Sequence, residues 1–215
     1  CQVSPAIFLI KNGPFHILGG NSNHAKAQEL INSIPSGSTI LPSPPAWITK
    51  LEKQPNIYLE KYERFSLCHE NISINHLNNI INSTSHHADI KAINLSLALA
   101  ISQNADFQYH LQNFKSENDF LERGLGFAAL LNGSIVGVAS TALVCSSGFE
   151  INIMVLPEHR GKSLGKVLAA HLLKSIRVHD KVPNWDAANK VSLNLAKKLG
   201  YEYKSKYLAY RVRKV

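Results

Sequence analysis

Cysteine is scarce in this chain of 215 residues. Only three are present, Cys1, Cys68 and Cys145, and no two of them have CxxC spacing. An odd, sparse set of this kind argues against a disulfide framework and against a zinc site. We therefore expect no bound metal, and we expect a protein of a reducing compartment, the cytoplasm.

Long apolar runs are also missing. The longest, such as residues 135–145, are too short to span a bilayer and are interrupted by Gly, Ser and Thr. The first residues do not show a basic stretch followed by an apolar one, so we expect neither a signal peptide nor a membrane partner. Apolar residues still make up 45% of the chain, which is enough for a buried core and is not a disordered composition.

Acidic residues are few in the last third of the chain. Residues 151–215 hold 14 Lys and Arg against 4 Asp and Glu, whereas residues 1–150 hold 9 against 11. A basic segment of this strength indicates an anionic partner. Nucleic acid and a phosphate-rich cofactor both qualify, and charge alone does not choose between them.

The first part of the chain alternates short apolar runs with turns that contain Pro and Gly. A polar stretch rich in Asn, Ser and His over residues 70–87 is the expected boundary, so we predict a small α/β portion over residues 1–75 and a second domain over residues 76–215. In the first portion the pattern predicts strands at 5–10, 15–18, 39–41 and 57–67 and helices at 23–34 and 46–51.

Three strand-like runs in the second portion are joined by tight turns. Asn132-Gly133 links the first two and is a strong signal for a two-residue hairpin, so the three runs predict an antiparallel meander. The fold class is α/β, or α+β in looser usage. The elements expected here are strands at 88–94, 127–131, 135–145, 149–155, 181–184, 201–203 and 207–213, with helices at 95–103, 163–178 and 189–199.

The most informative segment connects a strand to a helix over residues 155–165. Its loop is basic and contains small residues. The first turn of a helix carries unpaired N–H groups and a partial positive charge, which small residues allow a phosphate to approach. Because GxxxxGK[ST] and GxGxxG are both absent, a solvated basic helix start stays an alternative. The predicted pyrophosphate site consists of Arg160, Gly161, Lys162, Ser163, Leu164 and Gly165.

A second segment, Asn189–Tyr201, follows the loop at a suitable distance. The two segments together resemble the GNAT acetyltransferases, which carry R/Q-x-x-G-x-G/A at a strand-to-helix junction and then N-x-x-[A/S]-x-x-L-x-x-K-x-G-[F/Y]. The resemblance covers roughly residues 88–215. The run Trp185-Asp186-Ala187-Ala188, with Pro44-Pro45-Ala46-Trp47 upstream, is similar to the subfamily that includes the zwittermicin A resistance protein.

The resemblance implies a mixed, mostly antiparallel, splayed sheet with helices on both faces. It makes residues 1–75 a degenerate or truncated half of the same fold. It implies that the backbone of Ile153 and Val155 pairs with the pantetheine arm of coenzyme A, that the amides of Arg160–Gly165 hold the pyrophosphate, and that Asn189 contacts the pantetheine arm.

Two positions depart from the family pattern. Ser163 replaces the first Gly of the G-x-G pair, although its small hydroxyl side chain can still bond a phosphate. Ala196 stands where many members place the Tyr that protonates the departing thiolate, so Ser192, the nearest hydroxyl by spacing, is our candidate acid. Glu150 is the only carboxylate between residues 127 and 156 and is our candidate general base.

The resulting hypothesis is an N-acetyltransferase that uses acetyl-coenzyme A. The acetyl group would pass to a primary amine that attacks the thioester directly. The acceptor would be a small molecule, an amino-bearing antibiotic or related metabolite. One alternative is a catalytically inactive GNAT domain that binds coenzyme A. Another is a basic nucleic-acid-binding protein, although the basic third lacks interleaved aromatic residues, so we expect no nucleic-acid partner.

Overall fold

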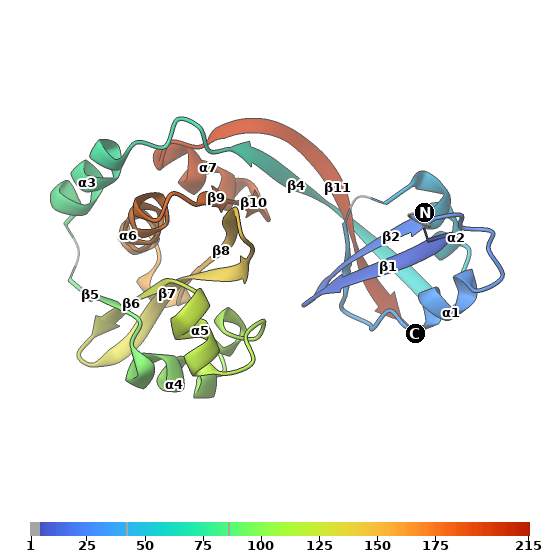
Figure 1. The fold of residues 1–215 in the computed structure, drawn as a ribbon, viewed down its shortest axis with the longest axis horizontal. Helices are drawn as coiled ribbons and strands as arrows, with labels where there is room; N and C mark the ends of the chain where they lie inside the picture. The colour runs from blue at the N-terminus through green and yellow to red at the C-terminus, as the bar shows by residue number, and fades with distance from the viewer. Residues whose placement is uncertain (1–4, 42, 86) are drawn as a thin grey trace. The chain divides into compact units, whose positions relative to one another are not determined.

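The computed structural model describes residues 5–41, 43–85 and 87–215, and Cys1 lies outside them (Figure 1). The chain forms two compact units. One holds the chain up to Arg64 together with Lys206–Val215, and the other holds Phe65–Ser205. The boundaries between the units lie after Arg64 and after Ser205, and not between residues 75 and 76 as expected. Two long strands, β4 (Ile57–Cys68) and β11 (Glu202–Lys214), each run through both units.

The first unit packs two short helices against strands. Trp47 is the largest wholly buried side chain, and its indole N–H donates to the carbonyl of Gly20 at 3.0 Å, so its one polar atom is satisfied. Leu18, Ile31, Leu51 and Val212 complete the centre of this core. Besides its parts of β4 and β11, the unit contains β1 (Ile7–Asn12), β2 (Phe15–Gly20), α1 (Ala27–Asn32), β3 (Thr39–Ile40) and α2 (Pro45–Glu52).

The end of the chain forms one strand where the sequence predicted two. We expected strands at 201–203 and 207–213 with a break between them, but β11 runs unbroken through the polar residues at 204–206. The prediction was wrong because that stretch lacks apolar alternation, whereas hydrogen bonding to the neighbouring strand β4 is enough to keep the backbone extended.

The second unit is built on a five-stranded sheet of order β5-β6-β7-β8-β9. Its central strands form the predicted antiparallel meander. Asn132 and Gly133 both have positive φ, 51° and 80°, as the predicted two-residue hairpin requires. The strands are β5 (Asp89–Ala92), β6 (Gly126–Leu131), β7 (Ser134–Val144), β8 (Gly148–Val155), β9 (Val182–Asn184) and the separate β10 (Asp186–Ala187).

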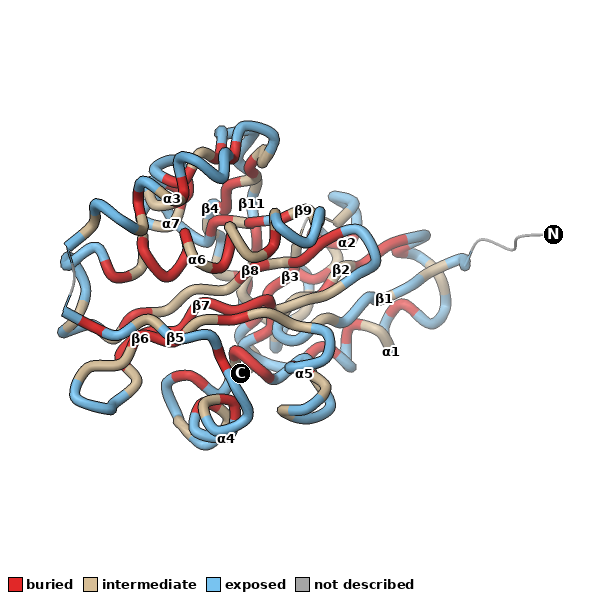
Figure 2. The backbone as a smooth tube through the Cα atoms, turned by 60° about the vertical axis from the view of Figure 1, so that its left-hand side comes forward, coloured by how far each residue is buried: buried red, intermediate tan, exposed pale blue. Residues whose placement is uncertain are grey.

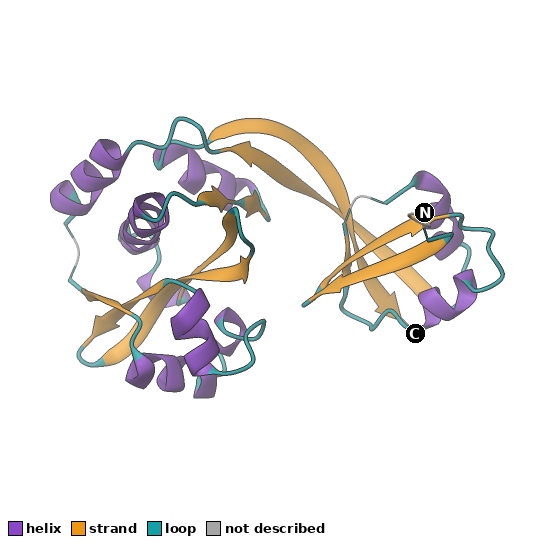
Figure 3. Cartoon of the chain, in the orientation of Figure 1, coloured by secondary structure: helices purple, strands orange, loops and turns teal. Residues whose placement is uncertain are grey.

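Helices cover both faces of this sheet, as predicted (Figure 3). On one face, α6 buries an apolar stripe of Val167, Leu168, Leu172 and Ile176 completely, and Figure 2 shows its buried positions beside those of the sheet. The other face carries α4 (Leu95–Gln103), η1 (Gln108–His110) and α5 (Glu117–Arg123). The helical elements are α3 (Ile74–Ser83), α4 (Leu95–Gln103), η1 (Gln108–His110), α5 (Glu117–Arg123), η2 (Pro157–His159), α6 (Leu164–Val178) and α7 (Lys190–Lys198).

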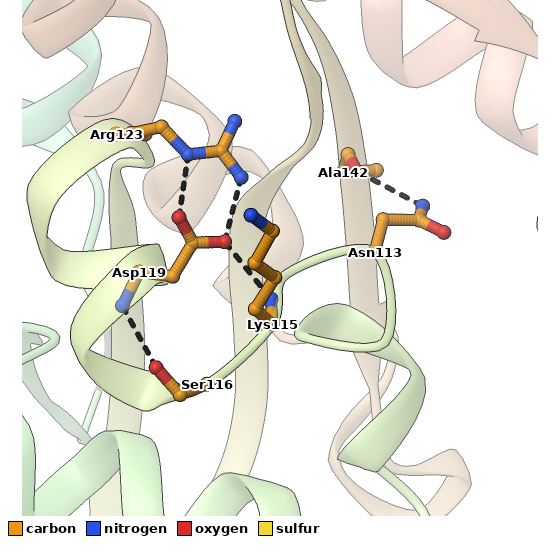
Figure 4. A network of polar contacts seen from close by, with 6 residues as sticks. All are labelled: Asn113, Lys115, Ser116, Asp119, Arg123 and Ala142. Carbon is orange, nitrogen blue, oxygen red and sulfur yellow. Dashed lines mark hydrogen bonds and ion pairs between the residues drawn. The ribbon is translucent and has the colours of Figure 1, made fainter.

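Short-range polar contacts hold the loop before α5 in place (Figure 4). The hydroxyl of Ser116 caps α5 by accepting from the N–H of Asp119 at 3.2 Å. The carboxylate of Asp119 accepts two hydrogen bonds from Arg123, at 2.7 and 2.6 Å, and these lower the pKa of Asp119. Asn113 donates to the carbonyl of Ala142 at 3.0 Å and thereby ties this layer to the sheet.

One histidine, the last residue of η1, is buried in the apolar layer between this element and the sheet. Only 1% of the surface of His110 is exposed, and its Nδ1 lies 2.7 Å from the hydroxyl oxygen of Ser140 on β7. No protein group among the described residues pairs with its Nε2. Burial lowers the pKa of His110 from 6.5 to about 3, because the charged imidazole loses its hydration. The folded protein therefore holds this histidine neutral.

Replacing His110 with Asn should flatten the dependence of stability on acid pH. The unfolded chain binds a proton near pH 6.5 and the folded chain only near pH 3, so stability is full above pH 6.5 and falls between these values. The loss should approach about 1.4 kcal/mol per pH unit. Urea unfolding of both proteins at pH 7, 6, 5 and 4 measures it, and parallel curves for the two proteins would contradict the assignment.

Candidate active site

The loop between β8 and α6 has an unusual backbone. Gly161 and Ser163 both adopt positive φ, 77° and 59°. Ser163 is the residue before α6, and its side chain makes no capping hydrogen bond among the described residues. The Ser163 carbonyl accepts from the N–H groups of Lys166 and Val167. The N–H groups of the two residues that begin the helix, Leu164 and Gly165, have no intrahelical acceptor and are available to an anion.

Arg160 fixes this loop to the end of the strand. Its Nε donates to the carbonyl of Val155 at 2.9 Å, which keeps the guanidinium beside the loop. Lys162 adds a second positive charge two residues before α6 begins. The six residues that the sequence assigned to a pyrophosphate site thus lie at the N-terminus of α6, where residues 160–163 are exposed and Leu164 is buried.

A cavity of about 500 Å³ adjoins the same loop. One part of its wall is apolar, and the rest is polar or basic. It draws on four separate segments of the chain, which is why the sequence did not indicate it. The lining residues are Ser85, His87, Ala88, Leu131, Val136, His159 and Gly161–Leu164.

The second half of β8 has an open edge. The parallel pairing of β8 with β9 covers only Gly148–Glu150, whereas its pairing with β7 continues to Val155. The cause lies just after β9. The chain leaves this sheet at Asn184 and enters the other one at Asp186, which pairs with Ser66 of β4. Among the described strands, none pairs with residues 151–155 on this side.

The alternation of residues along β8 determines which of its backbone groups face the open edge. The N–H of Leu156 donates to the carbonyl of Val136 on β7, and the carbonyl of Ser147 accepts from the N–H of Val182, the first residue of β9. The odd-numbered residues of β8 therefore face β9. Ile153 therefore presents both its N–H and its carbonyl at the open edge. Val155 presents its N–H, while its carbonyl is taken by Arg160.

Glu150 lies at the last residue pair before the two strands part. One carboxylate oxygen accepts from the side-chain amide of Asn184, and the other accepts from the backbone N–H of Asp186 at 3.2 Å. The carboxylate therefore bridges β8 to the chain on either side of Trp185. This places the predicted base beside the opening, in a position where it also holds the strands together.

Asn189 and Ser192 meet at the start of α7. Asn189 caps the helix by accepting from the N–H of Ser192 at 2.9 Å. The hydroxyl of Ser192 accepts from the indole N–H of Trp185 at 3.1 Å. The Asn189 amide nitrogen and the Ser192 hydroxyl proton remain as donors. Ala196, one turn further on, is wholly buried and offers no hydroxyl.

Two absences among the described residues bear on the site. Within residues 5–41, 43–85 and 87–215, no group of three or more His, Cys, Asp and Glu side chains could hold a metal ion. None of the helices in that part of the chain combines the length and the apolar character needed to cross a membrane.

Comparisons with known proteins bear on both the fold and the site. A family model described as GNAT acetyltransferase matches residues 2–210. The crystal structure of a GCN5-related N-acetyltransferase-like protein from Streptococcus suis 89/1591 is 25% identical, covering 98% of this chain and 85% of that one, with a TM-score of 0.85. A GCN5-related N-acetyltransferase from Kribbella flavida shares the fold at 11% identity, covering 95% and 89%, with a TM-score of 0.56.

Among curated proteins, the uncharacterized N-acetyltransferase YdfB of Bacillus subtilis (strain 168) is 29% identical over 104 residues. The match covers 47% of this chain and 40% of that protein's length. The predicted GNAT fold is confirmed by these similarities. The narrower resemblance to the zwittermicin A resistance subfamily stays a prediction.

Replacing Ser163 with Gly should stabilise the protein by up to about 1 kcal/mol. A left-handed backbone costs a side-chain-bearing residue about 1–2 kcal/mol, and the greater freedom of Gly in the unfolded chain offsets part of that gain. Chemical unfolding at pH 7 measures the change. Asn132→Gly is the matched control, because Asn tolerates its φ of 51° and should gain less. A loss of stability in Ser163→Gly would show that the hydroxyl makes a stabilising contact.

Proposed function

The chain belongs to the GNAT acetyltransferase family, and we propose that it transfers an acetyl group from acetyl-coenzyme A to a primary amine. One observation carries the proposal. The open edge of β8 runs directly into a loop whose free N–H groups begin α6, so one continuous surface offers peptide-like hydrogen bonds and then an anion site.

The pantetheine arm and the pyrophosphate of coenzyme A each match one part of this surface. The amides of a pantetheine arm can pair with the backbone of Ile153 and Val155 as an added strand would. The pyrophosphate suits the loop amides of Arg160–Gly165, with the charges of Arg160 and Lys162 beside them. We assign Asn189 to the pantetheine arm as well, because its capping bond uses the side-chain oxygen and leaves the amide nitrogen as a donor.

The chemistry is attack by a neutral amine nitrogen on the thioester carbonyl carbon. The C–N bond forms, the C–S bond breaks, the amine loses a proton and the thiolate must gain one. We assign the proton acceptor to Glu150, directly or through water, and the oxyanion donors to N–H groups at the open edge. Ser192 is the proposed proton donor to the thiolate, since Ala196 carries no hydroxyl.

The acceptor is proposed to be a small molecule that bears a primary amine. This rests on the resemblance to the zwittermicin A resistance subfamily and not on geometry. A coenzyme A-binding domain without activity is the second candidate, favoured by the buried Ala196 in place of a tyrosine.

Ion pairs within the first unit weaken the case for nucleic acid as the anionic partner. Lys206 pairs with Glu63 at 2.6 Å, and Arg213 and Arg211 pair with Glu60 at 3.2 and 3.8 Å. Much of the basic charge at the end of the chain thus faces acidic side chains of β4. We propose that the remaining surplus beside α6 serves the cofactor.

Replacing Gly165 with Val should weaken acetyl-coenzyme A binding at least about tenfold while the protein stays folded. A Cβ at this position meets only Val155 and Leu195, at ordinary distances of 3.6 and 3.8 Å, so the fold has room for it. The added methyl groups would crowd the first turn of α6, whose N–H groups an approaching phosphate needs. Calorimetry gives the affinity and thermal unfolding tests the fold; unchanged affinity would remove this loop from the site.

Replacing Glu150 with Gln tests the proposed base. Loss of a general base should lower the rate about 10²- to 10⁴-fold, with a defect that shrinks at high pH where more amine is already neutral. The amide would also present N–H groups to Asn184 or to the Asp186 N–H, so some loss of melting temperature is expected.

Asn184→Ala is the matched control for Glu150→Gln. It removes one partner of the carboxylate and leaves the carboxylate itself in place. If Asn184→Ala lowers the rate as much as Glu150→Gln does, the role of Glu150 is to hold the strands together. A rate defect confined to Glu150→Gln, with coenzyme A affinity unchanged, supports the base.

A further inference from the structure

The cavity beside the phosphate loop has a lining that suits a nucleotide. Ala88, Leu131, Val136 and Leu164 supply apolar surface. His87, His159 and Lys162 supply nitrogen donors, with the hydroxyls of Ser85 and Ser163 beside them. At about 500 Å³ the cavity lies within the usual size range of small-molecule sites. Apolar walls with a few converging polar groups are typical of sites that bind a ring and one charged group.

The charge of the cavity lining favours an anionic ligand over the amine acceptor. None of the described lining residues is Asp or Glu, and one is a lysine. A protonated amine would be repelled by Lys162 and would find no carboxylate. A phosphate would be attracted, and the two histidines and the lysine can each donate a hydrogen bond to it.

The position of the cavity fits the far end of the cofactor. It shares Gly161–Leu164 with the pyrophosphate loop, so a ligand held there continues directly into it. Its other walls come from β6, β7, η2 and the connection between α3 and β5, whereas the open edge of β8 faces β9. The cavity and the acyl-transfer edge therefore lie on opposite sides of β8, and the loop is the point where they meet.

We propose that this cavity binds the 3′-phosphoadenosine end of coenzyme A, with the adenine on the apolar wall and the 3′-phosphate on His87, His159 and Lys162. The inference rests on the proposed function. It assigns a cofactor role to the connection between α3 and β5, which supplies Ser85, His87 and Ala88 and lies outside the two sequence motifs.

The test compares coenzyme A with 3′-dephospho-coenzyme A, which lacks only the phosphate in question. Calorimetry on the full chain should give coenzyme A about tenfold tighter binding, the order expected for charge-assisted hydrogen bonds to one phosphate. In His87→Ala combined with His159→Ala, this ratio should fall towards one while the affinity for the dephospho form stays near that of the parent. His179→Ala is the matched control, since His179 lies beyond the far end of α6 and should keep the full ratio.

The outcomes separate this inference from the function on which it rests. If both ligands bind the parent protein equally, the 3′-phosphate lies elsewhere and the inference fails, while coenzyme A binding stands. If the ratio survives in the double variant, these histidines are not its source and the inference fails. If neither ligand binds, the proposed function itself fails. Thermal unfolding of each variant excludes loss of fold, which the exposed position of His87 makes a small risk.

Discussion

The site depends on the point near Trp185 at which the backbone stops pairing with one strand and begins to pair with another. Before this residue the chain pairs with β8, and after it the chain pairs with β4 of the other sheet. Trp185 itself is buried against Tyr201, with the two rings nearly perpendicular. The buried indole therefore anchors the point at which the strands part. Because β9 must leave there, β8 keeps an unpaired edge that ends at the anion-binding loop.

The same constraint explains the surroundings of Glu150. Its carboxylate accepts from groups on both sides of the switch, Asn184 before it and Asp186 after it. The bond from Asp186 satisfies a backbone N–H at the point where the strand pairing is interrupted. Each carboxylate oxygen has a second lone pair beside the one that its donor uses, so these two bonds do not by themselves prevent the carboxylate from taking a proton from an amine. Structural and chemical roles are thus coupled in this one side chain.

Local patterns predicted the parts of this protein that local physics determines. The alternation over 127–155 and the Asn132-Gly133 turn fixed the meander, and the helix-start chemistry located the loop at 160–165. Features that depend on distant segments were not predictable in this way. The cavity combines four segments, and the neutral state of His110 comes from layers packed on it by separate elements. Neither leaves a periodic or spacing signal in the sequence.

The two departures from the family pattern differ in physical consequence. Ser163 lies at an exposed turn, where a side chain at positive φ costs only local strain and leaves the helix-start N–H groups open. Ala196 is wholly buried in the core, where a tyrosine ring would have to displace packed neighbours at a cost of about 1–3 kcal/mol or more. A missing hydroxyl at that position cannot be restored by a small adjustment. Ser192 lies one turn earlier on α7 and accepts from Trp185, so its own proton stays available for donation.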